Sequence, residues 1–259
     1  MNLDNTLWLA SFLTEATVVG FLIYRRVWKT FPFFCLYCVW LVFVDAAAYA
    51  VQRFFPASYF SFYLATTIVY SALELAVLVE LTWSVLRPLG ALLPRGALLV
   101  VAGFILGIGI AIWPFAVIPG FGYFPPQWHF LMRLEQTTSI LRVVFFLVLA
   151  GCSQLLSIGW RDRELQIASG LGFYSLVGLG VAMLHTHMTT GSQLRFLNQV
   201  EVAGYLCSLM YWVFSFAAKE AERREFTPQM QSFLLALAGT ARTTRVNFVD
   251  PPSRKPRGR

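Results

Sequence analysis

The stretch that decides the fold is Gln127–Trp160, QWHFLMRLEQTTSILRVVFFLVLAGCSQLLSIGW. It is long and apolar enough to cross a bilayer as a helix. Its first half nevertheless carries charged and polar side chains, namely Arg133, Glu135, Gln136, Thr137, Thr138, Ser139 and Arg142. A charge near the bilayer centre costs several kcal/mol unless it faces a protein interior and finds a partner. We therefore expect other helices to surround the polar face of this one.

The composition places the whole chain in the membrane class. Of its 259 residues, 58% are hydrophobic and only 13% are charged, whereas about a quarter of a soluble domain is charged. Apolar spans of about 20 residues can be drawn at 6–24, 32–53, 59–85, 97–118, 128–158, 165–187 and 195–218. The predicted fold class is therefore an all-α integral membrane bundle of seven transmembrane helices over residues 1–225, with the lipid bilayer as its first partner.

The basic residues predict the orientation of this bundle. Arg25, Arg26 and Lys29 follow the first span, and further Lys or Arg residues follow the third, fifth and seventh spans. The connections on the other side hold only Arg53 and Arg195. Because cytoplasmic loops carry the excess of Lys and Arg, we expect the N-terminus outside, the C-terminus in the cytoplasm, and a multi-pass protein of the plasma membrane.

The segment after the seventh span predicts a short cytoplasmic helix at 226–240. Thr227 precedes Pro228 at a helix start, and Met230, Phe233, Leu234 and Leu237 then share one apolar face. Residues 241–259 are basic and predict a disordered tail attracted to anionic lipid. Basic residues interleaved with aromatics do not form a groove outside the spans, so nucleic acid is not an expected partner.

Polar residues recur at helical spacing in several spans, which indicates stripes that face the bundle interior. In the third span Tyr63, Thr67, Tyr70 and Glu74 fall at offsets 0, 4, 7 and 11, and in the seventh Asn198, Glu201, Tyr205 and Ser208 fall at 0, 3, 7 and 10. The fifth span aligns Glu135, either Thr138 or Ser139, and Arg142, and the second aligns Asp45, Tyr49 and Gln52.

Depth in the membrane predicts which of these residues pair. With a rise of about 1.5 Å per residue, Glu74 and Arg142 both lie roughly 22 Å below their outer helix ends, which predicts an ion pair. Arg133, Asp45 and Glu201 lie roughly 9–12 Å below the outer surface and are expected to form a second cluster. Two more acids, Glu15 and Glu135, lie between these levels.

Two interpretations of this polar interior remain open. Buried ion pairs and tyrosine hydrogen bonds can simply fix the register of the helices, with no ligand involved. The functional interpretation is an outward-facing cavity or an ion or proton path. It is favoured because the acids in the spans (Glu15, Asp45, Glu74, Glu135 and Glu201) outnumber Arg133 and Arg142, and an unpaired buried acid is either protonated or binds a cation.

Histidines and cysteines give two weaker patterns. His129, His185 and His187 all fall on the predicted outer side, where imidazoles can hold a metal ion such as zinc, although interfacial histidines with ordinary hydrogen bonds are the default interpretation. Cys35 and Cys38 have the spacing of a redox pair. Small apolar cysteines are the simpler interpretation, because no second pair is present to relay electrons.

Glycines in two spans indicate close helix packing. Gly103 and Gly107 form a small-xxx-small pair in the fourth span, and Gly170, Gly172, Gly178 and Gly180 recur in the sixth. Such residues let helix backbones approach one another in a membrane. We expect both sets to pack within the bundle.

Familiar seven-helix proteins do not match these motifs. A retinal Schiff base needs a lysine deep in the bundle, but Lys29, Lys219 and Lys255 all fall at or beyond inner helix ends, so retinal is excluded as a cofactor. The third span is followed by WSVLRPLG rather than an Asp-Arg-Tyr type signature, and the seventh lacks Asn-Pro-x-x-Tyr. The chain resembles, in span number and orientation alone, the seven-helix sensory modules that bacteria place before signalling domains.

The functional prediction is therefore a sensor-like or ligand-binding module with a polar outward-facing cavity and a separate cytoplasmic signalling partner. The alternative is a small transporter or proton-coupled carrier that uses the intramembrane carboxylates. A membrane-embedded enzyme comes third, because the sequence contains no specific nucleophile–base pair or metal-ligand motif.

Overall fold

The computed structural model describes residues 3–86, 96–116, 126–151, 162–185 and 191–218. Within these ranges the chain forms seven α-helices and no strand. The helices are α1 (Leu3–Tyr24), α2 (Pro32–Phe54), α3 (Tyr59–Leu86), α4 (Ala97–Ile112), α5 (Pro126–Gly151), α6 (Arg163–His185) and α7 (Gly191–Ala217). Three single 3-10 turns flank them: η1 (Val27–Lys29), η2 (Pro56–Ser58) and η4 (Trp113–Phe115).

Seven helices in the described part of the chain are long and apolar enough to cross a membrane. The predicted all-α class and the predicted number of spans are therefore confirmed for these residues. The fourth span was predicted to continue to residue 118, but α4 ends at Ile112 and η4 follows, because Pro114 has no N–H to donate within a helix. The predicted helix at 226–240 and the tail at 241–259 lie outside the described residues.

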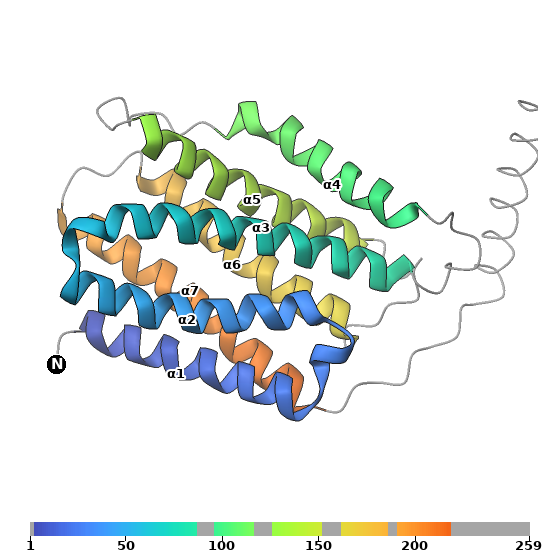
Figure 1. Cartoon of the computed structure of the whole chain (residues 1–259), viewed down its shortest axis with the longest axis horizontal. Helices are drawn as coiled ribbons and strands as arrows, with labels where there is room; N and C mark the ends of the chain where they lie inside the picture. The colour runs from blue at the N-terminus through green and yellow to red at the C-terminus, as the bar shows by residue number, and fades with distance from the viewer. Residues whose placement is uncertain (1–2, 87–95, 117–125, 152–161, 186–190, 219–259) are drawn as a thin grey trace, which may run out of the picture.

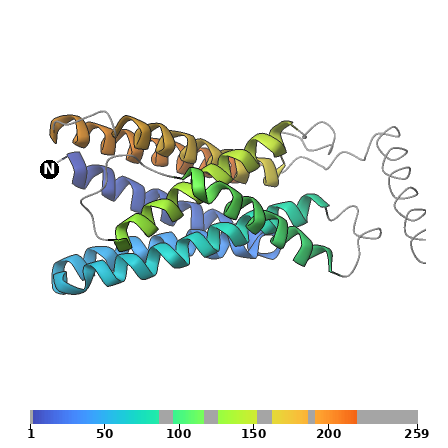
Figure 2. The same cartoon turned by 90° about the horizontal axis from the view of Figure 1, so that it is seen from above.

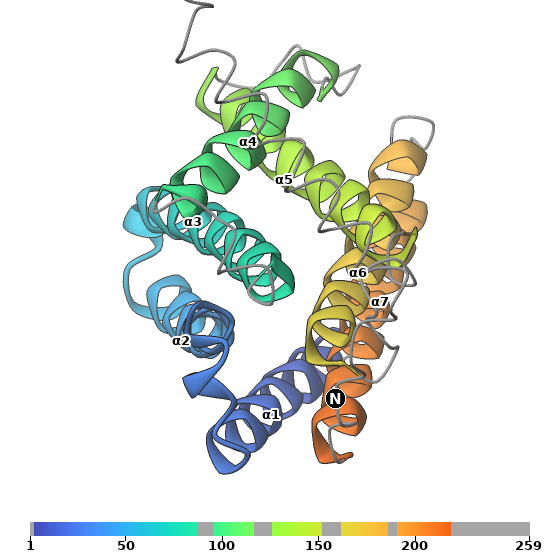
Figure 3. The same cartoon turned by 90° about the vertical axis from the view of Figure 1, so that its right-hand side faces the viewer.

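Six of the helices form a closed ring (Figures 1 and 3). Viewed end-on, the order around the ring is α1, α2, α3, α5, α6 and α7, and α7 packs back against α1. Figure 2 places α6 and α7 on one side and α2 and α3 on the other, with α1 and α5 between them. The polar stripes predicted from the sequence can meet because ring closure turns one face of each helix toward a common centre.

Helix α4 lies outside this ring, against α3 and α5. Its outer face is strongly apolar: Leu99 is 75% exposed, Phe104 69% and Ile110 74%. Contiguous apolar surface of this kind is rare on soluble monomers. In a bilayer the acyl chains would cover it, so the surface agrees with a membrane protein.

The ring is closed at one end by an apolar plug, which we define as Leu22, Phe34, Leu81, Leu165, Trp212 and Phe216. Each of these side chains is at most 2% exposed. The ring of Phe34 meets that of Trp212 edge to face, with 5.2 Å between centroids, a favourable geometry for aromatic pairs. The plug occupies the end where α1, α3 and α7 finish, and we call this the basic end because Arg25, Arg26 and Lys29 follow α1 there.

Charged side chains cap the helices at the basic end. Arg25 donates to the carbonyl of Ala217 at 2.6 Å, and Arg163 donates to the carbonyls of Ser215 at 2.7 Å and Ala218 at 3.1 Å. The last carbonyls of a helix lack partners within the helix and carry partial negative charge. Both arginines therefore fix the end of α7 to its neighbours.

A carboxylate caps the start of α2 in the complementary way. Glu80 of α3 accepts hydrogen bonds from the backbone N–H groups of Phe33 and Phe34, each at 2.9 Å. An anion at a helix N-terminus satisfies free donors and opposes the positive end of the helix dipole. The Glu80 cap therefore joins α3 to α2 directly below the polar interior.

Two glycines of α6, Gly170 and Gly172, pack closely, whereas Gly103 and Gly107 of α4 do not. A methyl group added at Gly170 would lie 2.2 Å from the indole nitrogen of Trp212, and one at Gly172 would lie 2.7 Å from Phe146. A methyl group at Gly103 or Gly107 would meet no atom within 4 Å. The packing prediction holds at Gly170 and Gly172. It is wrong for Gly180, which also meets no atom within 4 Å, and for the two glycines of α4, because α4 lies at the edge of the bundle.

Candidate functional site

An ion pair between α3 and α5 occupies the centre of the bundle. Arg142 pairs with Glu74, as their equal predicted depth requires, and the two residues are only 4% and 2% exposed. The guanidinium also donates to the hydroxyl of Ser139 at 2.9 Å and lies over the ring of Tyr174, 5.6 Å from its centroid. These three partners, one of them anionic, hold a cation that would otherwise be very costly at this depth.

Tyrosine hydroxyls extend this pair into a network. Arg142 is 3.4 Å from the hydroxyl of Tyr70, which is 3.0 Å from that of Tyr37 on α2. About two helical turns before Tyr70 on α3, the hydroxyl of Tyr63 donates to the carboxylate of Glu135 on α5 at 2.9 Å. The stripe predicted on α3 thus points inward and reaches both α2 and α5.

A second buried acid lies across the ring. Glu15 of α1 is 3% exposed and accepts a hydrogen bond from the hydroxyl of Tyr205 on α7 at 2.6 Å. The Oε1 atom makes this bond, and Oε2 is buried with no hydrogen-bond partner. Buried polar atoms are nearly always satisfied, so this oxygen marks a position where a further donor is needed.

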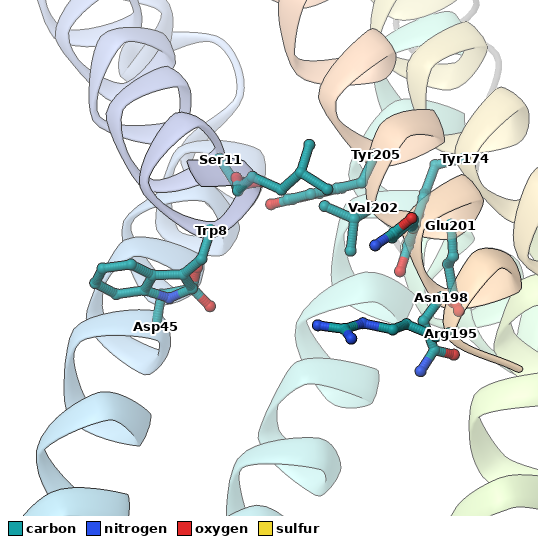
Figure 4. A pocket seen from close by; sticks show the side chains of 11 residues that line it. Trp8, Ser11, Asp45, Tyr174, Arg195, Asn198, Glu201, Val202 and Tyr205 are labelled. Atoms are coloured by element: carbon teal, nitrogen blue, oxygen red, sulfur yellow. The ribbon is translucent and has the colours of Figure 1, made fainter. Parts of the chain in front are cut away.

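A cavity of about 530 Å³, which we call the large cavity, lies between α1, α2, α6 and α7. Figure 4 shows Trp8 and Asp45 on one wall and Glu201, Val202 and Tyr205 facing them. The remaining lining residues are Leu7, Ser11, Tyr174, Arg195, Asn198 and Gln199. Because α1 and α7 begin here and α2 ends here, the large cavity lies at the N-terminal end of the bundle.

A second cavity of about 340 Å³, the tyrosine chamber, lies deeper. It shares Asp45, Tyr174 and Tyr205 with the large cavity, so the two adjoin. Its other lining residues are Glu15, Trp40, Leu41, Val44, Tyr63, Thr66, Thr67 and Tyr70. A smaller cavity of about 270 Å³ between α5, α6 and α7 is lined in part by Glu135, Ser139, Tyr174 and Glu201.

The predicted second cluster is wrong in one member. Asp45 and Glu201 both line the large cavity, but in the described residues no ion pair joins Arg133 to either acid. Arg133 comes nine residues before Arg142 (142 − 133 = 9), and at about 100° per residue this separation turns it to the opposite side of α5. The basic residue that reaches into the large cavity is Arg195 of α7 (Figure 4).

Sequence reasoning also missed the residue that joins the cavities. Tyr174 of α6 lines all three of those described above and stacks under Arg142. Its ring lies 5.2 Å from that of Tyr205. The only signal was a single tyrosine in the middle of a span that otherwise indicated glycine packing.

The predicted metal ligands do not form a described cluster. His129 lies near the start of α5, the side chain of His185 is not described, and His187 lies outside the described residues. Within the described ranges no group of three His, Cys, Asp or Glu residues is placed to hold a metal ion. Cys35 and Cys38 are free thiols.

The structure thus gathers most of the predicted residues around connected cavities. Glu15, Asp45, Glu74, Glu135, Glu201, Arg142, Tyr70 and Tyr205 either line them or contact residues that do. This arrangement can bind a small polar molecule, and its hydroxyl network can also relay protons. No family model, curated protein or solved structure matches this chain.

Proposed function

We propose that the chain is a sensor-like, ligand-binding module of the plasma membrane that binds a small polar ligand through a cavity open to the outside. The observation that carries this proposal is the large cavity of about 530 Å³, whose walls bear both Asp45 and Glu201 together with aromatic rings. Ligand sites are concave, partly apolar, and contain a few placed polar groups. The large cavity has each of these properties.

The charge distribution supports the orientation of this cavity. Arg25, Arg26, Lys29 and Arg163 lie at the basic end, opposite the large cavity. The positive-inside rule assigns that end to the cytoplasm. The N-terminus and the mouth of the cavity then face the outside, and the segment after α7 emerges in the cytoplasm, where it would contact a separate signalling partner.

The apolar plug favours a binding module over a carrier. Phe34, Leu81 and Phe216 are fully buried, and they lie between the polar network and the basic end. A carrier must expose its site to both sides in turn. A carrier would therefore have to open the plug, whereas a binding module would keep it closed.

The proton-coupled carrier remains the second candidate because of one observation. Buried carboxylate oxygens without partners occur at two depths, in Glu15 and Glu74, and tyrosine hydroxyls lie between them. Proteoliposomes separate the two candidates. Proton uptake triggered by external amines, amino acids or sugars would support the carrier, whereas flux equal to that of empty liposomes would support the binding module.

Cysteine labelling tests whether the cavity contains water and opens outward. Val202 lines the large cavity, whereas Val200 is 36% exposed on the outer surface of α7; the two residues lie about 200° apart around the helix. We expect Val202→Cys in intact cells to react with a membrane-impermeant thiol reagent although it lies roughly 16 Å along α7. Val200→Cys is the matched control and should remain at the background of the unmodified chain. Equal labelling of both, or labelling of Val202→Cys only from the cytoplasmic side, would refute the proposal.

A further inference from the structure

The tyrosine chamber has an unusual combination of linings. It contains two carboxylates, Glu15 and Asp45, and no lysine, arginine or histidine among the described residues that line it. The rest of its polar wall consists of one tryptophan, four tyrosines and two threonines. Anionic groups surrounded by electron-rich rings attract cations, because the face of an aromatic ring carries negative potential.

Two residues that line this chamber each carry a buried polar atom without a hydrogen-bond partner. Oε2 of Glu15 has no hydrogen-bond partner although the residue is 97% buried, being 3% exposed. The indole nitrogen of Trp40 is likewise buried without a partner, and Trp40 lines the same chamber. The carboxylate oxygen can accept a hydrogen bond or lie against a positive charge, whereas the indole N–H requires an acceptor, so one cationic ligand with a hydroxyl group would satisfy both atoms.

From these observations we propose that the tyrosine chamber binds a small organic cation, a protonated or quaternary amine that carries a hydroxyl group. Its ammonium group lies against Glu15 and Asp45 and among the tyrosine rings, and its hydroxyl oxygen accepts from Trp40. The ligand enters through the large cavity, which shares Asp45, Tyr174 and Tyr205 with the chamber. This inference rests on the proposed function and specifies its ligand class.

The chemistry of the wall favours an organic cation over a metal ion. Ca²⁺ and Mg²⁺ require six or more oxygen ligands at fixed short distances. The chamber is walled instead by wide aromatic surfaces, which suit the diffuse charge of an alkylammonium group. Its volume of about 340 Å³ falls within the usual range of small-molecule sites, about 300–1,000 Å³.

The test uses the purified full-length chain in lipid nanodiscs, with choline and ethanolamine as probes. The matched control for charge is 3,3-dimethyl-1-butanol, which has the shape of choline but carries no charge. Binding is followed by isothermal titration calorimetry and by the rise in unfolding temperature. We expect at least one of the two amines to bind and to stabilise the chain, and the neutral analogue to do neither at the same concentration.

Two variants locate the site. Glu15→Gln keeps the oxygen that accepts from Tyr205 but removes the charge, so the affinity for the amine should fall about 10- to 100-fold. Asp45→Asn should weaken binding in the same direction. Glu80→Gln, an acid replaced at the basic end far from the chamber, should leave the affinity unchanged. The unfolding temperature without ligand verifies that each variant is folded.

The outcomes separate this inference from the proposed function. Failure of both amines to bind, equal binding of the neutral analogue, or unchanged affinity in both Glu15→Gln and Asp45→Asn would overturn the ligand class. If Val202→Cys is nevertheless labelled from the outside, the binding-module proposal survives this failure. If Val202→Cys is not labelled, both proposals fail.

Discussion

The ion pair between Glu74 and Arg142 gives the sharpest quantitative prediction. Arg142→Ala removes every guanidinium contact and leaves the carboxylate of Glu74 buried at 2% exposure with no cation beside it. Removing one partner of a buried pair typically costs about 3–5 kcal/mol. The variant also loses the hydrogen bond to Ser139 and the stacking on the ring of Tyr174. We therefore expect a loss of stability in the upper half of that range.

A double-mutant cycle separates the pair from simple loss of packing. Glu74→Gln removes the stranded charge, so the double variant Arg142→Ala/Glu74→Gln should be more stable than Arg142→Ala alone, with a coupling energy of about 1–3 kcal/mol. The assay is reversible unfolding in mixed micelles with increasing sodium dodecyl sulfate, followed by circular dichroism. Helix α5 offers an internal control in Arg133→Ala, which removes the same type of side chain from its opposite face.

We expect Arg133→Ala to change the free energy of unfolding by less than about 1 kcal/mol, since it removes no buried ion pair. Additive effects of Arg142→Ala and Glu74→Gln would refute the claim that the two charges depend on each other. An equal loss of stability in Arg133→Ala and Arg142→Ala would refute the assigned rotation of α5.

Three further predictions test the packing, the second acid and the membrane face. Gly170→Ala should lower the free energy of unfolding by about 1–3 kcal/mol, because its methyl group would lie 2.2 Å from a tryptophan of α7. The control Gly180→Ala on the same helix meets no atom within 4 Å and should not destabilise the chain. Equal effects of the two substitutions would contradict the α6–α7 packing. Tyr205→Phe removes the hydroxyl that donates to Glu15 and should cost about 1–3 kcal/mol. This cost should shrink in a Glu15→Gln background, and a constant cost would contradict the hydrogen bond. Phe104→Arg places a charge on the exposed apolar face of α4, so membrane insertion should be less favourable by about 2.5–3.5 kcal/mol. The measurement is the yield of the variant in the membrane fraction, which should fall. An unchanged yield would contradict the contact of this face with lipid.

Hydrophobic length predicted the helices well because the bilayer imposes it. A span needs about 20 apolar residues whatever its neighbours are, and seven helices that satisfy this requirement are present in the described ranges. The predicted and observed ends of α2 differ by a single residue. The exception is the fourth span, predicted to reach residue 118, because Pro114 ends α4 at Ile112.

The depth of a residue in the membrane predicted its partner only where both side chains also face the bundle interior. Glu74 and Arg142 lie at equal depth and on inward faces, and they pair. Arg133 has a suitable depth but the wrong rotation, and the separation of nine residues from Arg142 already contained this information. A depth estimate must therefore be combined with the helical period before partners are assigned.

The arrangement of the helices could not be predicted in this way. Lipid tails are as apolar as leucine, so hydrophobicity does not distinguish a helix face that packs on protein from one that faces lipid. Nothing in the sequence places α4 outside the ring or returns α7 to α1. The contact between Glu15 and Tyr205 depends on that return across 190 positions, and the tyrosine chamber depends on the contact.

The central claim is that the polar faces of these helices enclose a water-accessible cavity at the outer end of the bundle. The most direct test is a cysteine scan through positions 198–206 of α7, labelled in intact cells with a membrane-impermeant thiol reagent. We predict that labelling repeats with the helical period of about 3.6 residues and peaks at the positions that line the large cavity, which are Asn198, Gln199, Glu201, Val202 and Tyr205. Uniform labelling, or peaks at the intervening lipid-facing positions, would contradict the account.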